Sequence, residues 1–393
     1  MIDRASRLRK GPRASIAGIG ATPYYFRGES APQTIYEMIG KAILAAVADA
    51  GLSVRDIDGM AFYSYGFEGA QIVEQLGLPE LNFAAVVSGQ GGGSAGVLDL
   101  AAMAIETGRA KAVICIGACQ QIASRYGQSL AGLATTPQGV LSLTSGLTGP
   151  GQSLALFARR HMHAYGTRRE AFAEVVMASR AYAASRPEAI RKKQITLEDY
   201  FAAPMLADPL CRYDFCVESD AALAFVVTSA ERARDLRQKP VDILGAVHGG
   251  KREWGRAFFW MNQPDDLFAS SGARAIAERL YGETGVAPAD IDVALLYDHF
   301  SPLVVMQLED YGFCGKGEGG PFVESGAIRP GGAIPVNPHG GQLSECYVIG
   351  MTQIREAVEQ LRGTATNQVS GASLALVTGG PAPIPMSAAI LGV

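Results

Sequence analysis

One order of elements occurs twice along this chain, and this repeat restricts the fold more than any other feature. Each copy begins with an apolar segment, at residues 15–21 and 242–248. A stretch with apolar residues at i, i+3 and i+4 spacing follows, at residues 34–52 and 268–286, and this spacing is typical of an amphipathic helix. We therefore expect a strand and then a helix at the start of each copy.

The two copies keep the same spacing through the turn that follows each helix. The helices are expected to end at Gly51 and Gly285, which lie 234 residues apart, because glycine readily adopts the left-handed conformation that ends a helix. Asp56 and Asp290 in the following turns keep the same separation. A short apolar strand comes after each turn, so the turn and the strand repeat without a gap.

A third pair of apolar segments completes the repeat. Residues 112–117 and 374–379 are continuously apolar, as in strands that are buried on both faces of a sheet. Strands that alternate with helices, given twice, predict an α/β protein with two similar halves packed in layers. We place the halves at residues 1–239 and 240–393. The first half includes an insertion of helices and proline-rich connections at residues 120–235.

Composition limits the classes of function. A chain of 393 residues with 48% hydrophobic and 18% charged residues is typical of a globular protein. Its net charge of −4 disfavours a general nucleic-acid binder, which needs a basic face, and no apolar run predicts a membrane span. No apolar signal core follows the basic N-terminus, so we expect a cytoplasmic protein with reduced cysteines. The cysteines lack zinc-ligand spacing; they are Cys115, Cys119, Cys211, Cys216, Cys314 and Cys346.

A glycine-rich segment at residues 337–350 resembles a catalytic signature of the thiolase superfamily. In that signature a glycine pair is followed six residues later by the catalytic histidine, and then by another glycine. Gly340 and Gly341 match the pair, and Gly350 matches the last glycine. Tyr347 stands in the position of the histidine.

Two further motifs resemble the sterol-carrier branch of the same superfamily. The motif YDHFS matches that branch at Asp298 and at its phenylalanine and serine, but begins with Tyr297 in place of a residue that helps to form an oxyanion hole. The loop before the helix expected at residues 97–107 matches the loop of the nucleophilic cysteine, and Gly91 stands in the cysteine's position. The last catalytic cysteine of the family is also missing, and Gly379 lies at the equivalent turn.

Among thiolase relatives, this pattern resembles the bacterial steroid side-chain aldolases. The resemblance implies an α/β protein of the thiolase fold, in which duplicated βαβαβαββ halves form a layered α/β/α/β/α core. It also implies retro-aldol cleavage of a bulky β-hydroxyacyl-CoA, which releases a ketone and a short acyl-CoA such as propionyl-CoA. The implied assembly is a homodimer that joins a zinc-ribbon and OB-fold partner subunit in a heterotetramer. No cofactor is expected in this chain, because the CoA thioester is the substrate and any zinc belongs to the partner.

The residue types suit this chemistry. Thiolysis through Gly91 is excluded, because a covalent thioester needs a thiolate that glycine lacks. Backbone N–H groups near Gly91 and Gly92, at the positive end of the following helix, are expected to stabilise an enolate oxygen together with the turn at Gly379. Proton exchange with the substrate is assigned to Tyr347 and polarisation or relay to Tyr297, although the residue types also allow the reverse order.

Neighbouring residues complete the predicted site. Asp298, His299 and His339 are expected to orient or tune the tyrosines, and His339 and Gly340 are expected to contact the substrate. Simpler interpretations stay open, because a tyrosine at a strand end is often a packing residue with a hydrogen-bonded hydroxyl, and a histidine beside two glycines can fix a turn.

Two other functions stay open for the whole chain. One is a non-catalytic subunit that binds acyl-CoA or lipid, and the other is a thiolase with an atypical cysteine, for which Cys346 is the candidate. His161 and His163 lie two residues apart on an expected helix and face different directions, which disfavours a metal site. A basic cluster is expected to form a solvated face rather than a site for CoA phosphates; its members are Arg186, Arg191, Lys192 and Lys193.

Overall fold

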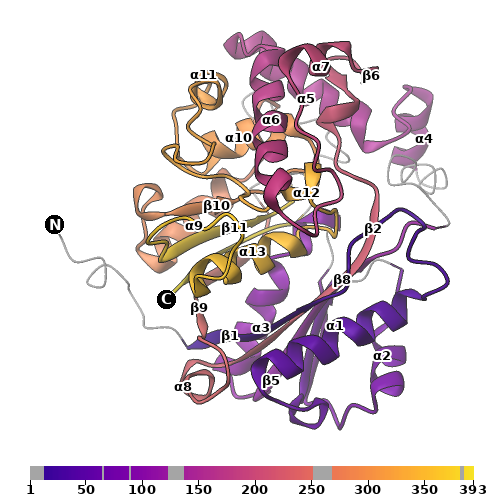
Figure 1. The fold of residues 1–393 in the computed structure, drawn as a ribbon, viewed down its shortest axis with the longest axis vertical. Helices are drawn as coiled ribbons and strands as arrows, with labels where there is room; N and C mark the ends of the chain where they lie inside the picture. Colours follow the sequence, from indigo (N-terminus) through magenta and orange to yellow (C-terminus); the bar gives the residue numbers. More distant parts are fainter. Residues whose placement is uncertain (1–12, 64–65, 88–89, 123–136, 251–267, 381–384) are drawn as a thin grey trace.

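The computed structural model describes residues 13–63, 66–87, 90–122, 137–250, 268–380 and 385–393. Within them the chain forms a mixed α/β structure in which the two halves of the repeat lie against each other (Figure 1). The strands of the first half are β1 (Ala14–Ala21), β2 (Tyr25–Phe26), β3 (Gly59–Tyr63), β4 (Phe83–Val87), β5 (Ala112–Cys119) and β8 (Ser219–Ser229). Those of the second half are β9 (Val241–Gly249), β10 (Val293–Leu295), β11 (Leu374–Gly379) and β12 (Met386–Gly392).

The two halves of the sheet repeat one strand order. The first half runs β4-β3-β5-β8-β1 and the second runs β10-β11-β12-β9. In each half the last strand in sequence, β8 or β12, is antiparallel to both neighbours. The counterpart of β4 in the second half is reduced to one parallel bridge between Ala294 and Val336. A short contact between β1 and β9 joins the halves, and the predicted duplicated α/β fold is confirmed.

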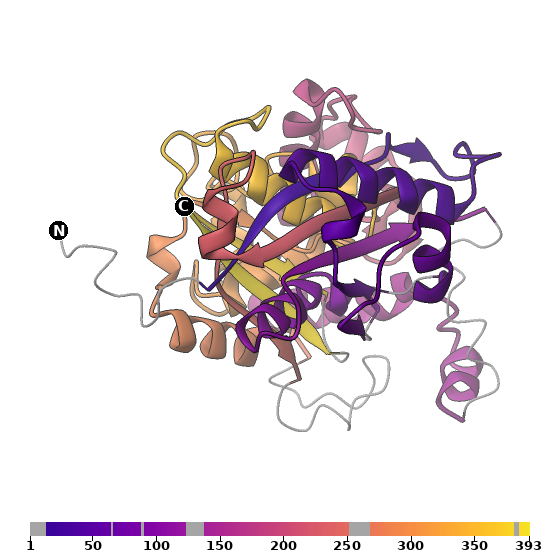
Figure 2. The ribbon, with the colours of Figure 1, turned by 90° about the horizontal axis from the view of Figure 1, so that it is seen from below.

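Helices form three layers around these strands. The central layer is α3 (Gly96–Glu106) and α13 (Met351–Arg362), and each packs against strands of both halves. Helix α1 (Ile35–Ala50) covers the outer face of the first half, where it packs along β1 and β8 (Figure 2). Helix α9 (Arg274–Thr284) covers the outer face of the second half. Alternate residues of each strand therefore enter different cores, and the order of layers is the predicted α/β/α/β/α.

The insertion and the second half contain the remaining helices. In the insertion are α4 (Pro137–Thr144), α5 (Pro150–Tyr165), α6 (Arg169–Ser185), α7 (Leu197–Ala202) and the hairpin of β6 (Met205–Ala207) and β7 (Leu210–Cys211). Strand β8 belongs to the main sheet, so the part of the expected insertion from residue 219 onward enters that sheet, and helix α8 (Ala230–Arg234) connects β8 to β9. The second half adds α10 (Ser301–Asp310), α11 (Gly319–Glu324) and α12 (Gly341–Ser344). Helix α6 packs on all three of them, beside α12 in Figure 1.

Local chemistry sets the ends of the repeated elements. Gly51 and Gly285 both cap their helices with φ of 75°, as predicted. The second repeated helix begins at residue 274 rather than 268, because the hydroxyls of Ser270 and Ser271 both donate to the Asp310 carboxylate and hold this stretch in turns. The sequence pattern did not contain this long-range contact.

Candidate active site

Tyr297 lies just beyond β10, where the backbone is fixed by side chains of two neighbouring elements. Its N–H donates to Thr378 Oγ1 at 2.9 Å, and its carbonyl accepts from Gln307 Nε2 at 2.8 Å. The two partners are themselves joined, because Thr378 Oγ1 donates to Gln307 Oε1 at 2.7 Å. The ring of Tyr297 is 1% exposed, so its direction is set by packing on every side.

The hydroxyl of Tyr297 fills the space beside Gly91. A Cβ atom on Gly91 would lie closer than 3.0 Å to the Tyr297 hydroxyl oxygen, a separation that real Cβ atoms essentially never show. The phenol therefore stands where a side chain of residue 91 would project. The glycine at position 91 thus leaves the room that this phenol occupies.

The glycine loop around Gly91 also packs backbone to backbone against the second half. A Cβ on Gly92 would overlap the carbonyl oxygen of Pro385, and a Cβ on Gly380 would overlap the backbone nitrogen of Gly92. A Cβ on Gly379 would lie 3.2 Å from the Gly92 carbonyl oxygen. The structure therefore brings Gly91, Gly92 and Gly379 together, at the start of α3.

Tyr347 lies on the loop between α12 and α13 and is held by one serine of β8. The Tyr347 N–H donates to Ser219 Oγ at 2.9 Å, and the Ser219 hydroxyl donates to the Tyr347 carbonyl at 3.0 Å. Ile349, two residues later, has φ of 53°, a strained value for a β-branched residue. At Gly350 a Cβ would lie 2.9 Å from the Tyr297 ring, so the Tyr347 loop packs directly against Tyr297.

Asp298 holds the start of this loop. Its carboxylate accepts hydrogen bonds from the backbone N–H groups of Gln342 at 2.9 Å and Leu343 at 3.4 Å, and from Gln353 Nε2 at 3.0 Å. A Cβ on Gly341 would overlap the same carboxylate. Burial raises the pKa of Asp298 to about 6, although the hydrogen bonds act in the opposite direction. Asp298 therefore positions the Tyr347 loop through its contacts with α12.

His299 lies beside Tyr297, with ring centroids 4.9 Å apart in an edge-to-face arrangement. The imidazole is 3% exposed, and burial lowers the pKa of His299 to about 3. A ring that stays neutral at neutral pH suits a group that orients the neighbouring phenol through its edge. The structure thus brings Tyr297, His299, Tyr347 and Gly91 into one buried region.

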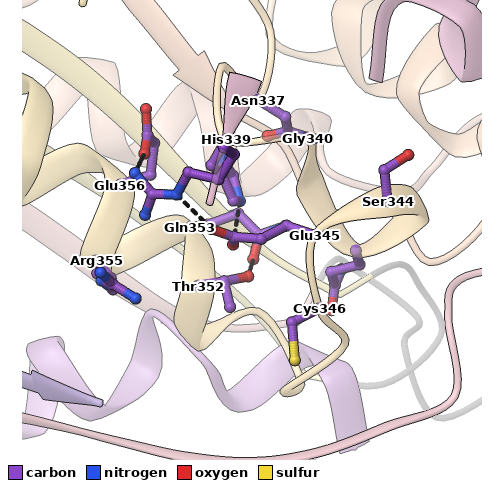
Figure 3. Close-up of polar contacts among 12 residues, drawn as sticks. Asn337, His339, Gly340, Ser344, Glu345, Cys346, Thr352, Gln353, Arg355 and Glu356 are labelled. Atoms are coloured by element: carbon purple, nitrogen blue, oxygen red, sulfur yellow. Dashed lines mark hydrogen bonds and ion pairs between the residues drawn. The ribbon is translucent and has the colours of Figure 1, made fainter. Parts of the chain in front are cut away.

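His339 and Gly340 occupy the other side of the same loop. The Gly340 carbonyl accepts from the Ser179 hydroxyl at 2.5 Å. His339 Nε2 lies 3.8 Å from Glu345 Oε2, in a buried ionic cluster that also contains Arg355 and Glu356 (Figure 3). Burial and the nearby arginines hold the pKa of His339 well below its usual range. The contacts of His339 are thus with this cluster rather than with the two tyrosines.

Comparisons with known proteins agree with this geometry. The family described as thiolase C-terminal domain-like matches residues 259–391. The 17-hydroxy-3-oxo-4-pregnene-20-carboxyl-CoA lyase of Mycobacterium tuberculosis is 38% identical over 388 residues, which cover 97% of this chain and 99% of that protein. The chain belongs to the aldolase branch of the thiolase superfamily.

Two further relatives place the chain in this aldolase branch. The steroid side-chain-cleaving aldolase of Thermomonospora curvata is 39% identical, and the match covers 96% of this chain and 97% of that protein. The solved structure of the Ltp2-ChsH2(DUF35) aldolase superposes with a TM-score of 0.90 at 38% identity, over 97% of this chain and 98% of that chain. The predicted family, the thiolase fold and the enzyme class of carbon–carbon lyase are confirmed.

Cys346, the candidate for an atypical thiolase nucleophile, is poorly suited to that role. It is fully buried, and its thiol donates to Ser219 Oγ at 3.3 Å. Burial raises the pKa of Cys346 well above its ordinary value, so the thiol stays protonated. In Figure 3 its sulfur points away from Glu345 and His339.

Two other sequence predictions concern Arg186 and the pair of His161 and His163. Arg186 is not on a solvated face: it is 3% exposed and its Nε donates to Glu345 at 2.8 Å. The repeat pattern could not show this, because the partner lies 159 residues away. His161 is buried between Thr167 and Glu309, whereas His163 is exposed. In the part of the chain that the structure describes, no group of three His, Cys, Asp or Glu side chains could hold a metal ion.

Sequence reasoning missed the polar residues that hold the tyrosines. Ser219 and Thr378 each fix the backbone of one tyrosine, and Gln307 links to Tyr297 from α10. Ser94 at the start of α3 carries a fully buried hydroxyl that would lie 2.6 Å from a Cβ on Gly379. The available signal was a single polar residue inside or beside an apolar segment, which by itself does not identify a catalytic partner.

Proposed function

We propose that this enzyme cleaves a bulky, steroid-type β-hydroxyacyl-CoA by a retro-aldol reaction and releases a ketone and a short acyl-CoA such as propionyl-CoA. One observation carries this proposal: the Tyr297 hydroxyl fills the space beside Gly91, the residue that we align with the nucleophilic cysteine of thiolases. A phenol there exchanges or polarises a proton but forms no acyl-enzyme. The names of the relatives from Mycobacterium tuberculosis and Thermomonospora curvata support a steroid side chain as the substrate.

The reaction needs proton transfer and charge stabilisation only. A base takes the proton of the β-hydroxyl, the electrons of that O–H bond form the ketone, and the Cα–Cβ bond breaks. Its electron pair moves to the α-carbon as a thioester enolate, which an acid then protonates. We assign the proton exchange to Tyr347 and polarisation to Tyr297, with backbone N–H groups near Gly91, Gly92 and Gly379 as donors to the enolate oxygen.

Product analysis tests the proposal directly. The purified chain, alone and with a co-expressed partner, is incubated with a CoA ester of a 17-hydroxy steroid side chain. We expect propionyl-CoA and a 17-ketone in equal amounts, measured by liquid chromatography with mass spectrometry. Binding without turnover in both conditions would favour the non-catalytic acyl-CoA or lipid-binding subunit. CoA-dependent acyl transfer that is lost in Cys346→Ala would favour the thiolase, against which the protonated state of that buried thiol argues.

Removal of each phenol hydroxyl tests the catalytic roles assigned to the two tyrosines. Tyr297→Phe and Tyr347→Phe should each lower kcat by about 10²- to 10⁴-fold, the usual range for a lost acid or base, with melting temperatures near wild type. Tyr281→Phe is the matched control, because its hydroxyl donates to the Tyr311 carbonyl in the packing of α9. Full activity in both site variants contradicts the mechanism, and loss in the control as well points to damaged packing.

The proposed assembly is a homodimer that binds a zinc-ribbon and OB-fold subunit to form a heterotetramer. The name of the solved aldolase includes a DUF35 partner, which supports a complex of this kind. Strand β4 supports the homodimer, because it pairs only with β3 among the described strands and its Val86 is 57% exposed. An unpaired sheet edge with exposed apolar side chains is a surface for pairing with a second chain. Of the described helices, none is long and apolar enough to cross a membrane.

A further inference from the structure

Arg180 on α6 is a buried cation without a carboxylate partner. It is 8% exposed, and within the described parts of the chain its Nε has no hydrogen-bond partner and its guanidinium forms no ion pair. The guanidinium lies over the ring of Tyr213, whose centroid is 5.7 Å from the guanidinium carbon. A buried, unpaired charge is costly, so this position indicates that a negatively charged group completes it.

Two more arginines face the same place. Arg212 lies 5.7 Å from the centroid of the Tyr213 ring, so this one ring contacts both guanidinium groups. Arg191 lies over the ring of Phe26 at 4.6 Å. Burial, together with the positive charges of Arg191 and Arg212, lowers the pKa of Arg180 to about 10, while Tyr213 acts in the opposite direction. Both neighbouring cations thus repel Arg180, and among the described groups that shift its pKa there is no carboxylate.

The segments around Arg180 and Arg191 form hydrogen bonds with α12 and the residue before it. Ser179, next to Arg180, donates to the Gly340 carbonyl and lies 2.7 Å from Ser344 Oγ. The N–H of Arg191 donates to the Ser344 carbonyl at 2.9 Å. Short stretches of backbone therefore connect Arg180 and Arg191 to the loop that leads to Tyr347.

The segment after Arg212 is attached to both tyrosine-bearing segments. The Cys216 N–H donates to the His299 carbonyl at 3.0 Å, two residues beyond Tyr297 in the chain. The next N–H, of Val217, donates to the Gln342 carbonyl of α12 at 3.0 Å. The three arginines thus have a fixed place relative to the catalytic loops.

We propose that Arg180, Arg191 and Arg212 bind a phosphate group of the CoA substrate while its thioester lies at the tyrosines. This inference rests on the proposed function in one respect, that the substrate is a CoA ester. Guanidinium groups bind phosphate oxygens through paired, charge-assisted hydrogen bonds. The exposed Arg191 and Arg212 attract the anion, and the buried Arg180 completes its binding. The predicted solvated face is thereby reassigned: Arg191 joins this site, and Arg180 and Arg212 are the members that the sequence pattern did not indicate.

Calorimetric titration with CoA tests the site without any turnover. We expect Arg180→Met to weaken CoA binding by about 10- to 100-fold. Arg180→Lys keeps the charge but loses the paired geometry, so its CoA affinity should lie between those of wild type and Arg180→Met. Pantetheine, which has no phosphate, should bind wild type and both variants equally. Arg274→Met is the matched control, because Arg274 is exposed on α9 and pairs only with Glu278 among the described residues.

The remaining outcomes separate the possible sources of the anion. Inorganic phosphate and dephospho-CoA, titrated in parallel, show whether the site takes any phosphate or the 3′-phosphate of CoA. Unchanged CoA affinity in Arg180→Met overturns the proposal. Unchanged CoA affinity together with loss of a co-expressed partner assigns the arginines to an acidic side chain of that partner instead. If Arg180→Met does not fold, Arg212→Gln at its exposed position must weaken CoA binding, and unchanged binding there also overturns the proposal.

This test and that of the proposed function fail independently. A wild-type protein that binds CoA through Arg180 but cleaves no β-hydroxyacyl-CoA supports the phosphate site and contradicts the lyase. A protein that cleaves the ester, with the same CoA affinity in wild type and Arg180→Met, supports the lyase and contradicts the phosphate site. Wild type that binds no CoA, alone or with its partner, contradicts the site outright.

Discussion

At the scale of single residues, the proposed chemistry depends on the contact between Gly91 and Tyr297. The smallest added side chain should disrupt it, because the Cβ of Gly91→Ala would overlap the Tyr297 hydroxyl. We expect this variant to lower kcat/KM by about 10²-fold or more, since misplacing a catalytic group by about 1 Å has an effect of that order. The cost in stability should be about 1–3 kcal/mol, as for other overpacked cores.

Gly282→Ala is the control for this variant. Gly282 lies within α9 with no atom within 4 Å of an added Cβ, so alanine there should raise the free energy of unfolding by about 0.5–1 kcal/mol and leave kcat unchanged. Steady-state kinetics and thermal unfolding measure both effects. Normal kinetics in Gly91→Ala would contradict the close contact of Tyr297 with the glycine.

The sequence motifs indicated candidate site residues but not the contacts that hold them in place. Gly91, Tyr297 and Tyr347 are visible because each interrupts a motif at a fixed spacing. Ser219 lies 128 residues from Tyr347, and the residues next to each of them in the sequence do not indicate this contact. His339 was expected at the substrate because it adjoins the glycine pair of the motif. In the fold, its Nε2 lies 3.8 Å from Glu345 Oε2.

At the scale of elements, Asp298 couples α12 to the end of β10, and its ionisation should be visible in stability. Its pKa is about 6 in the folded chain against an ordinary 3.8, so burial favours the protonated form. The stability that this carboxyl contributes is therefore complete below about pH 4 and is lost as the pH rises through about 6. Asp298→Asn stays neutral throughout. The free energy of unfolding of wild type, relative to this variant, should fall by on the order of 1–3 kcal/mol from about pH 4 to about pH 7.

Urea unfolding of both proteins across this pH range makes the measurement. A relative stability that instead rises with pH would mean that the three hydrogen bonds to the carboxylate outweigh the cost of its burial. Activity gives a second readout, because Asp298→Asn presents an amide N–H₂ to groups that are themselves donors. We expect a lower kcat with a smaller change in KM, as for a residue that positions Tyr347 without contacting the substrate.

The insertion is joined to the second half by a buried polar network. His161 on α5 lies 2.8 Å from Thr167 Oγ1 and 2.9 Å from Glu309 Oε1, and Lys316 Nζ donates to the other oxygen of Glu309 at 2.8 Å. His161→Ala leaves the buried Glu309 with fewer donors, and should cost about 2–4 kcal/mol in chemical unfolding. His163→Ala, on the exposed face of the same helix, should change the stability by less than about 0.5 kcal/mol. Equal changes in stability in the two variants would show that this network does not stabilise the contact between the insertion and the second half.

At the scale of the whole molecule, the fold could be predicted because it is a duplication. Copies of strand, helix and turn, repeated at constant spacing, indicate two similar halves, and buried apolar strands require helices on both faces. The repeat in the sequence did not show that the counterpart of β4 is reduced to a single bridge at Val336, because one bridged residue gives no periodic pattern of apolar residues. The halves therefore differ at their outer edges: the first ends in the exposed β4, whereas Ala294 and Val336 at the edge of the second share a buried core with residues of α6, α10 and α11.

This asymmetry predicts which edge would join the two copies of the proposed homodimer. On β4 and the adjoining α3, Val86 and Met103 are 57% and 47% exposed. A lysine on an edge strand blocks pairing between sheets, because its charge would lose water in the interface. Val86→Lys should therefore weaken the homodimer by on the order of 10- to 100-fold or more and shift its mass toward the monomer in size-exclusion chromatography with light scattering. Leu44→Lys, on the outer face of α1 and 53% exposed, should remain dimeric. A dimer that persists in Val86→Lys but dissociates in Leu44→Lys would place the interface on α1 rather than at the sheet edge.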